Sequence, residues 1–99
     1  MMIVLHGHGA DRHQFAESEI GEAKGVREAA ARHEVIFISP DYRACTSWMG
    51  PAAEADMLQI IRLLRKEYKI RKIFLAGGSM GGTSVLTFAA LHPELAAGV

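Results

Sequence analysis

The sequence predicts an α/β domain in which helices cover both faces of a parallel sheet, a three-layer αβα sandwich. Three short apolar runs, residues 3–5, 35–39 and 72–76, alternate with longer helical patterns. Strands that alternate with helices are typical of a parallel sheet joined by right-handed crossovers. The chain has 99 residues, so it holds one domain at most, and we expect about three strands and three helices within residues 1–99.

The first half of the chain supplies two strands and a helix. Residues 3–5 form a short apolar run that ends at a His-Gly turn signal. Residues 21–33, GEAKGVREAAARH, are rich in alanine and predict a helix, although two glycines weaken the pattern. Residues 35–39, VIFIS, are β-branched and aromatic and stop at Pro40, which predicts a buried strand.

The second half repeats this arrangement after a loop at residues 40–50. Residues 51–69 begin with a proline, which suits a first helical turn, and their apolar residues recur at helical spacing. Residues 72–76, KIFLA, are a short apolar run and predict the third strand. Residues 80–92 predict a buried helix, and the proline just beyond them marks its end.

Composition excludes several classes of protein. The net charge is zero, so the chain has neither the basic footprint of a nucleic-acid binder nor an acidic tail. Cys45 is the only cysteine, which excludes an internal disulfide. No apolar run approaches the roughly 20 residues of a membrane span, and no signal peptide is visible, so the compartment stays open. Both ends stop in apolar segments, and we therefore expect a piece of a longer chain, cut at both ends.

The turn after the third strand carries the motif G-x-S-x-G in Gly77-Gly78-Ser79-Met80-Gly81. A serine on a sharp turn between strand and helix has a strained backbone, and glycines flank it because side chains there would clash. Its hydroxyl is then exposed above the sheet, at a helix N-terminus that favours a developing negative charge. The apolar segments on both sides are the context that the motif requires, so we predict that Ser79 is a nucleophile.

Three stretches resemble the α/β-hydrolase family, in particular its esterase and prolyl-oligopeptidase-like members. They are IVLHGHG, FISPDYR and LAGGSMGG, the last followed by a helix ending in LHPE, and they occur in the family's order over nearly the whole chain. The resemblance implies a serine hydrolase that acts on carboxylic esters through an acyl-enzyme, with peptide bonds as the second choice. It implies a small-molecule substrate and no cofactor. It also places the first strand between the other two and leaves the outer edge of the third strand bare.

The resemblance further implies an oxyanion hole built from backbone N–H groups. Met80 would supply one donor and His8, in the loop between Gly7 and Gly9, the other. These two glycines let the loop backbone approach a ligand closely, and with Gly77 and Gly81 they shape the site.

A metal site is an alternative for the same loop. His6, His8, Asp11 and His13 have the spacing H-x-H-x-x-D-x-H, which is similar to the H-x-H-x-D-H cluster of metallo-β-lactamase-like hydrolases. Two insertions change the direction of the aspartate and the last histidine, and the reading leaves the serine turn unexplained. In the oxyanion-loop interpretation, His6 is packed and hydrogen-bonded and Asp11 orients the loop.

The general base that a serine nucleophile needs is not evident. After Ser79 the chain offers only His92 and Glu94, in the wrong order for this family. His92 lies 13 residues on along the same predicted helix, about 20 Å away at the helical rise. The triad acid and histidine would therefore belong to a longer parent chain. A second hypothesis is that these residues are a non-catalytic remnant of the fold.

The loop at residues 40–50 holds two further candidates. Trp48 borders the substrate pocket or packs beneath the loop, and the two interpretations are equally open. The resemblance implies that Arg43 is structural and pairs with Glu54 or Asp56 on the next helix.

Overall fold

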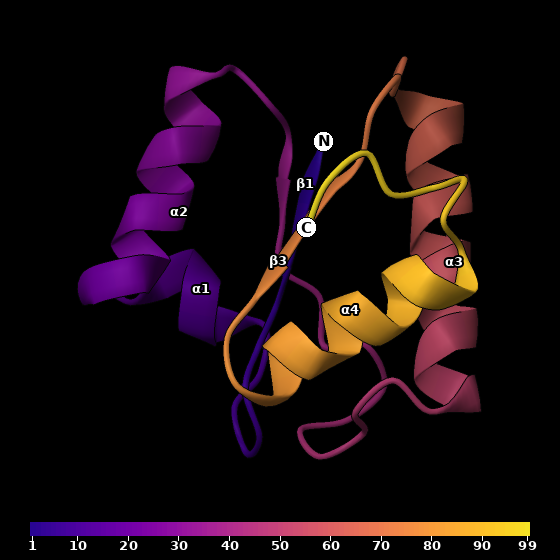
Figure 1. Ribbon diagram of the computed structural model, residues 1–99. Helices are drawn as coiled ribbons and strands as arrows, with labels where there is room; N and C mark the ends of the chain where they lie inside the picture. The colour runs from indigo at the N-terminus through magenta and orange to yellow at the C-terminus, as the bar shows by residue number, and fades with distance from the viewer.

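The computed structural model describes residues 1–99 and contains one sheet of three parallel strands. The strands are β1 (Met2–Leu5), β2 (Phe37–Ile38) and β3 (Phe74–Gly77), in the spatial order β2-β1-β3 (Figure 1). The predicted parallel sheet, with the first strand at its centre, is confirmed. All three strands therefore end on the same edge, where the loops that follow them meet.

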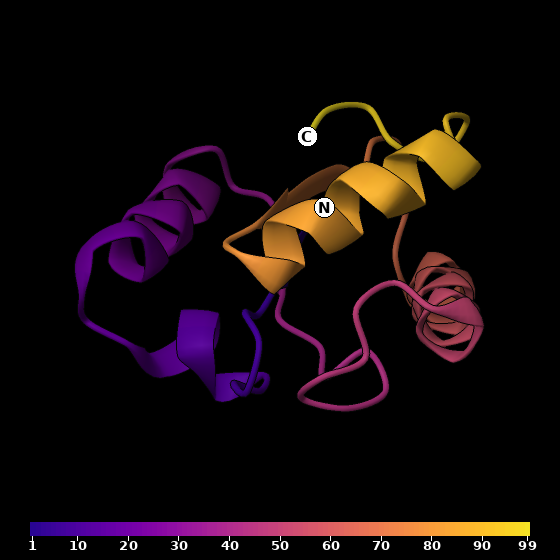
Figure 2. The ribbon, with the colours of Figure 1, turned by 60° about the horizontal axis from the view of Figure 1, so that its bottom comes forward.

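Helices cover both faces of this sheet, so the predicted three-layer αβα arrangement is confirmed. They are α1 (His13–Glu17), α2 (Gly21–Arg32), α3 (Pro51–Glu67) and α4 (Met80–Leu91). Figures 1 and 2 show α1 and α2 on one side of the strands and α3 and α4 on the other. None of the four is long and apolar enough to cross a membrane.

The alternation of side chains along β1 divides the core between the two faces. Ile3 and Leu5 lie in the larger cluster, which holds buried residues of α3 and α4 such as Met57 and Phe88. Val4 points the other way and packs in a smaller cluster with Phe15 and Ala23. Period-two alternation on a strand buried on both faces explains why all of its central residues are apolar.

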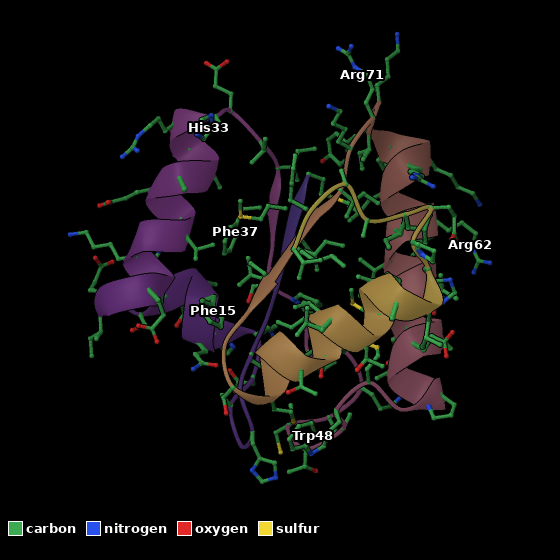
Figure 3. All side chains as sticks on the ribbon, in the orientation of Figure 1. Phe15, His33, Phe37, Trp48, Arg62 and Arg71 are labelled. Carbon is green, nitrogen blue, oxygen red and sulfur yellow. The ribbon has the colours of Figure 1, made fainter.

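Three elements differ most from the prediction: one helix is additional, and two strands have other bounds. Helix α1 was not predicted, because one buried aromatic, Phe15, is the only apolar side chain that its single turn contributes to the core (Figure 3). Strand β2 is shorter than residues 35–39 and half-buried, since it has a partner on only one side. The third strand is displaced by up to two residues, to Phe74–Gly77.

The outer edge of β3 is not bare over its whole length, which corrects the prediction. Phe74 forms a parallel bridge with Gly98. The N–H of Leu75 donates to the carbonyl of Gly98 (2.9 Å), and the N–H of Ala97 donates to that of Ile73 (2.8 Å). The C-terminal segment thus covers the beginning of this edge.

Candidate active site

Ser79 lies with Gly78 in the short turn between β3 and α4, and its backbone is strained. Its φ of 55° and ψ of −121° lie in a region that side chains rarely adopt. A non-glycine residue in such a region costs on the order of 1–3 kcal/mol and persists only where its surroundings enforce it. The side chain is exposed to solvent, and its hydroxyl makes no hydrogen bond within the chain. This is the strained, exposed serine that the motif predicts.

Two glycines of the motif are required by close backbone packing. A Cβ at Gly81 would overlap the carbonyl oxygen of Leu5 and would lie 2.7 Å from that of His6. A Cβ at Gly77 would lie 2.5 Å from the carbonyl of Gly81. Helix α4 therefore begins in direct backbone contact with the end of β1, and this contact holds Ser79 beside the loop that follows β1.

That loop passes close to the serine. A Cβ added at Gly7 would lie 3.6 Å from the Cβ of Ser79, an ordinary contact, so no steric conflict requires glycine at this position. Gly9 is different, because its φ of +80° favours glycine although the space around it is open. Gly7 thus leaves space beside the serine, whereas Gly9 gives the loop its left-handed backbone conformation.

Of the backbone N–H groups of Gly7, His8 and Gly9, two are hydrogen-bonded within the chain and one is not. The N–H of Gly7 donates to Oε1 of Gln14 (2.8 Å), and the N–H of Gly9 donates to the carbonyl of Cys45 (2.8 Å). The N–H of His8, between them, donates no hydrogen bond within the chain. At the other side of the site, Met80 begins α4, where the first N–H groups of a helix lack intrahelical partners.

Tyr42 supports the end of β1 from the loop after β2. Its hydroxyl donates to the carbonyl of His6 (2.8 Å), and the rings of Tyr42 and His6 lie 4.7 Å apart between centroids at a tilt of 41°. Burial raises the pKa of the Tyr42 phenol, so the hydroxyl keeps its proton and remains a donor. Tyr42 lies in the quoted motif FISPDYR, but its role was not predicted, because nothing in the sequence places it under His6.

An ion pair joins the loop before α1 to the loop after β2. Asp41 accepts hydrogen bonds from the backbone N–H of Arg12 (2.9 Å) and from its guanidinium (2.7 Å). These bonds lower the pKa of the Asp41 carboxyl, the backbone bond most strongly. Both side chains are largely exposed, so the pair is screened by solvent.

The pH dependence of stability is expected to report this pair. Because the pKa of Asp41 is lower in the folded state, the stabilisation is present above about pH 4 and is lost as the pH falls through the folded-state pKa. Urea denaturation should show wild type slightly more stable than Asp41→Asn at neutral pH, and the difference should close in acid. A difference that persists unchanged to about pH 2 would contradict this assignment.

No histidine forms a hydrogen bond with the hydroxyl of Ser79. His6 is buried, with its ring nitrogens 2.9 and 3.1 Å from the carbonyl oxygens of Gly7 and Asp41. This agrees with the packed, hydrogen-bonded role predicted for it. His92 ends α4, as predicted, and its Nε2 lies 2.8 Å from a carboxylate oxygen of Glu54. That contact links residues 38 apart in the chain and has no signal in the sequence.

Other charged residues of the loops form separate pairs. His13 is exposed and lies 2.7 Å from Glu17 on the same short helix, while Asp11 orients the start of that helix by accepting the N–H of His13 (2.9 Å). Together with the buried His6, these contacts show that the four residues of the metal alternative do not converge, and no group of three or more ligand side chains gathers anywhere. Arg43 pairs with Asp56 (2.9 Å), the second of its two predicted partners.

Trp48 lies at the carboxyl ends of the strands (Figure 3). Its side chain is 47% exposed, and its ring centroid is 6.5 Å from that of His8. None of the cavities of the molecule is lined by Ser79 or Trp48, although one of about 330 Å³ includes Gly77 and Gly82, on either side of the serine, in its lining. The largest, about 510 Å³, opens beside Met1 at the opposite end of the sheet. The surface around the serine is therefore open.

Fold and site together define a class: α/β proteins that present a strained serine between a parallel strand and the helix that follows it. The family model described as alpha/beta hydrolase fold matches residues 1–99. The chain therefore belongs to the α/β-hydrolase fold family, and the predicted resemblance is confirmed. No match was found among curated proteins or among solved structures.

Proposed function

We propose that the protein is a serine hydrolase of carboxylic esters in which Ser79 forms an acyl-enzyme. The observation that carries this proposal is the strained, exposed serine at φ 55°, close to Gly7 in the loop where the N–H of His8 is unpaired. Strain at an exposed polar residue has a stability cost, and such strain is concentrated at functional sites. Membership of a hydrolase family supports the same chemistry.

In the proposed reaction, Oγ of Ser79 attacks the ester carbonyl carbon and gives up its proton to a general base. The carbonyl oxygen becomes an oxyanion, which accepts hydrogen bonds from the backbone N–H groups of His8 and Met80. The positive end of the α4 dipole also favours this charge. The alcohol leaves with a proton, and water then attacks the acyl-enzyme to release the acid and restore the serine. No step requires a cofactor.

The general base and its orienting acid are proposed to come from a longer parent chain. In the structure, His6 contacts backbone carbonyls and His92 pairs with Glu54, so neither is placed to take the proton of Ser79. The same longer chain would complete the substrate pocket, which the open surface around Ser79 lacks.

The substrate is proposed to be a small molecule that contacts the loop residues next to Ser79. The exposed rings of Trp48 and His8 lie at the same end of the sheet as the serine, and their faces, tilted by 51° to each other, offer a partly apolar surface for an acyl or alcohol group. A peptide substrate would use the same nucleophile and oxyanion donors. We favour an ester over a peptide because a small substrate needs only this limited contact surface.

A non-catalytic remnant of the fold is the second candidate. Two observations favour it: no histidine hydrogen-bonds the Ser79 hydroxyl, and Ser79 lines none of the cavities. The two candidates differ in whether Ser79 is reactive in the protein as the cell makes it.

Covalent labelling of Ser79 tests the proposal. The open reading frame on both sides of codons 1–99 is first determined, and the whole encoded protein is expressed. A fluorophosphonate should add its mass to the peptide that contains Ser79, and hydrolysis of p-nitrophenyl butyrate should fall by about 10⁴-fold or more in Ser79→Ala. A folded protein that is neither labelled nor active would support the remnant instead.

A further inference from the structure

The backbone around Gly7 is held from several directions, and the side chains of Tyr42, Gln14 and His6 all contact it. The carbonyl of His6 accepts from Tyr42, and the N–H of Gly7 donates to Oε1 of Gln14 (2.8 Å). The carbonyl of Gly7 accepts from the N–H of Ala10 (3.1 Å), and Nδ1 of His6 lies 2.9 Å from the same oxygen. These contacts fix the peptide units on both sides of Gly7, a residue whose own dihedrals are little restricted.

Fixing Gly7 determines where the N–H of His8 points. The carbonyl of Gly7 and the N–H of His8 belong to one planar trans peptide, so they point in opposite directions. While the carbonyl is turned toward Ala10, the N–H of His8 is turned away from it and has no partner in the chain. Rotation of this peptide would bring the carbonyl oxygen round toward the position of the N–H, and an oxygen there would repel an oxyanion.

Gln14 contacts the loop from α1 and is held in place by its neighbour. Phe15 is buried against the sheet, which anchors the single turn of α1. The acceptor Oε1 would lie 3.8 Å from a Cβ built on Gly7, and Ser79 Cβ would lie 3.6 Å from the same point. The carboxamide thus lies on the same small region of the loop as the serine, without a hydrogen bond to the serine itself.

We propose that Gln14 is a positioning residue for the oxyanion hole, which acts by holding the N–H of Gly7 so that the N–H of His8 is free for the substrate oxygen. This inference rests on the proposed function and adds a residue to it. Gln14 touches neither the substrate carbonyl nor the hydroxyl of Ser79 in this role. Its effect is preorganisation, because a donor that is already aimed at the oxyanion needs no rearrangement during the reaction.

Gln14→Met in the whole encoded protein removes the acceptor while keeping the length of the side chain. The expected result is a kcat for p-nitrophenyl butyrate that falls about 10- to 100-fold with little change in KM, because the loss falls on the transition state. Inhibition by phenylboronic acid, whose serine adduct carries an oxyanion-like oxygen, should weaken by a similar factor. Gln59→Met, the same exchange at an exposed position of α3, should match wild type in both assays.

Amide hydrogen exchange separates a positioning effect from a general loss of stability. In Gln14→Met, exchange at the Gly7 N–H should accelerate while exchange at Ile3, in the centre of β1, stays at the wild-type rate. Gln14→Glu retains an acceptor of the same length and should keep Gly7 protected. Faster exchange at both sites in Gln14→Met would indicate unfolding and would overturn the proposal.

The outcomes also distinguish the inference from the function on which it rests. If wild type binds phenylboronic acid, Ser79→Ala does not, and Gln14→Met equals wild type, the nucleophile stands and the role of Gln14 is refuted. If wild type and Ser79→Ala are equally insensitive to the boronic acid, the proposed function fails and the inference fails with it.

Discussion

Replacement of Gly81 by alanine is expected to lower the free energy of unfolding strongly and to move the urea midpoint far below that of wild type. The new Cβ would overlap the carbonyl oxygen of Leu5 and lie 2.7 Å from that of His6. Both obstacles are backbone atoms at the end of a central strand, so neither can move aside as a flexible side chain would. The expected cost is about 3 kcal/mol or more, a large share of the roughly 5–15 kcal/mol that stabilises a typical domain.

Gly25→Ala is the matched control for this substitution. Gly25 lies inside α2, and nothing lies within 4 Å of a Cβ built there. Alanine is the better helix former, so this variant should be more stable than wild type by about 0.5–1 kcal/mol. Urea denaturation of both variants gives the comparison. A Gly81→Ala protein with a near wild-type midpoint would mean that α4 does not approach β1 as closely as the structure has it.

The close approach at Gly81 explains why much of the site could be predicted from sequence. The elbow is a local device: a strand, a strained serine and a helix within one short segment, with glycines where the backbone touches β1. Its pattern is therefore visible in consecutive residues. The parallel sheet was predictable for a similar reason, since each strand is a short apolar run between helices, and β1 could be placed in the centre through the family resemblance.

Several side-chain contacts that support the site were not predictable. Gln14 and Tyr42 reach the loop after β1 from α1 and from the loop after β2, and neither has a pattern of its own. Glu54 was expected near Arg43, but it pairs with His92 at the far end of α4. The pairing of Gly98 with Phe74 at the edge of β3 was not predicted, because a single bridge is too short to give a strand pattern in the sequence.

Replacement of Ser79 by glycine is expected to abolish ester hydrolysis and to raise stability. Glycine adopts positive φ at no steric cost, so the substitution relieves strain on the order of 1–3 kcal/mol. Part of this gain is offset, because glycine loses more conformational freedom on folding, by about 0.5–1 kcal/mol. A net increase of about 1 kcal/mol in the free energy of unfolding is therefore expected.

Ser79→Ala separates the two effects, because it removes the hydroxyl and keeps a Cβ at φ 55°. Urea denaturation should find Ser79→Ala close to wild type and Ser79→Gly clearly more stable, with both inactive in the ester assay. Equal stability of the two variants would show that the turn stores no strain at this residue. If Ser79→Gly is instead the more stable variant, the fold tolerates backbone strain at position 79 that glycine would avoid. The proposed nucleophile gives the physical reason, because only a residue with a side chain can present a hydroxyl above the sheet.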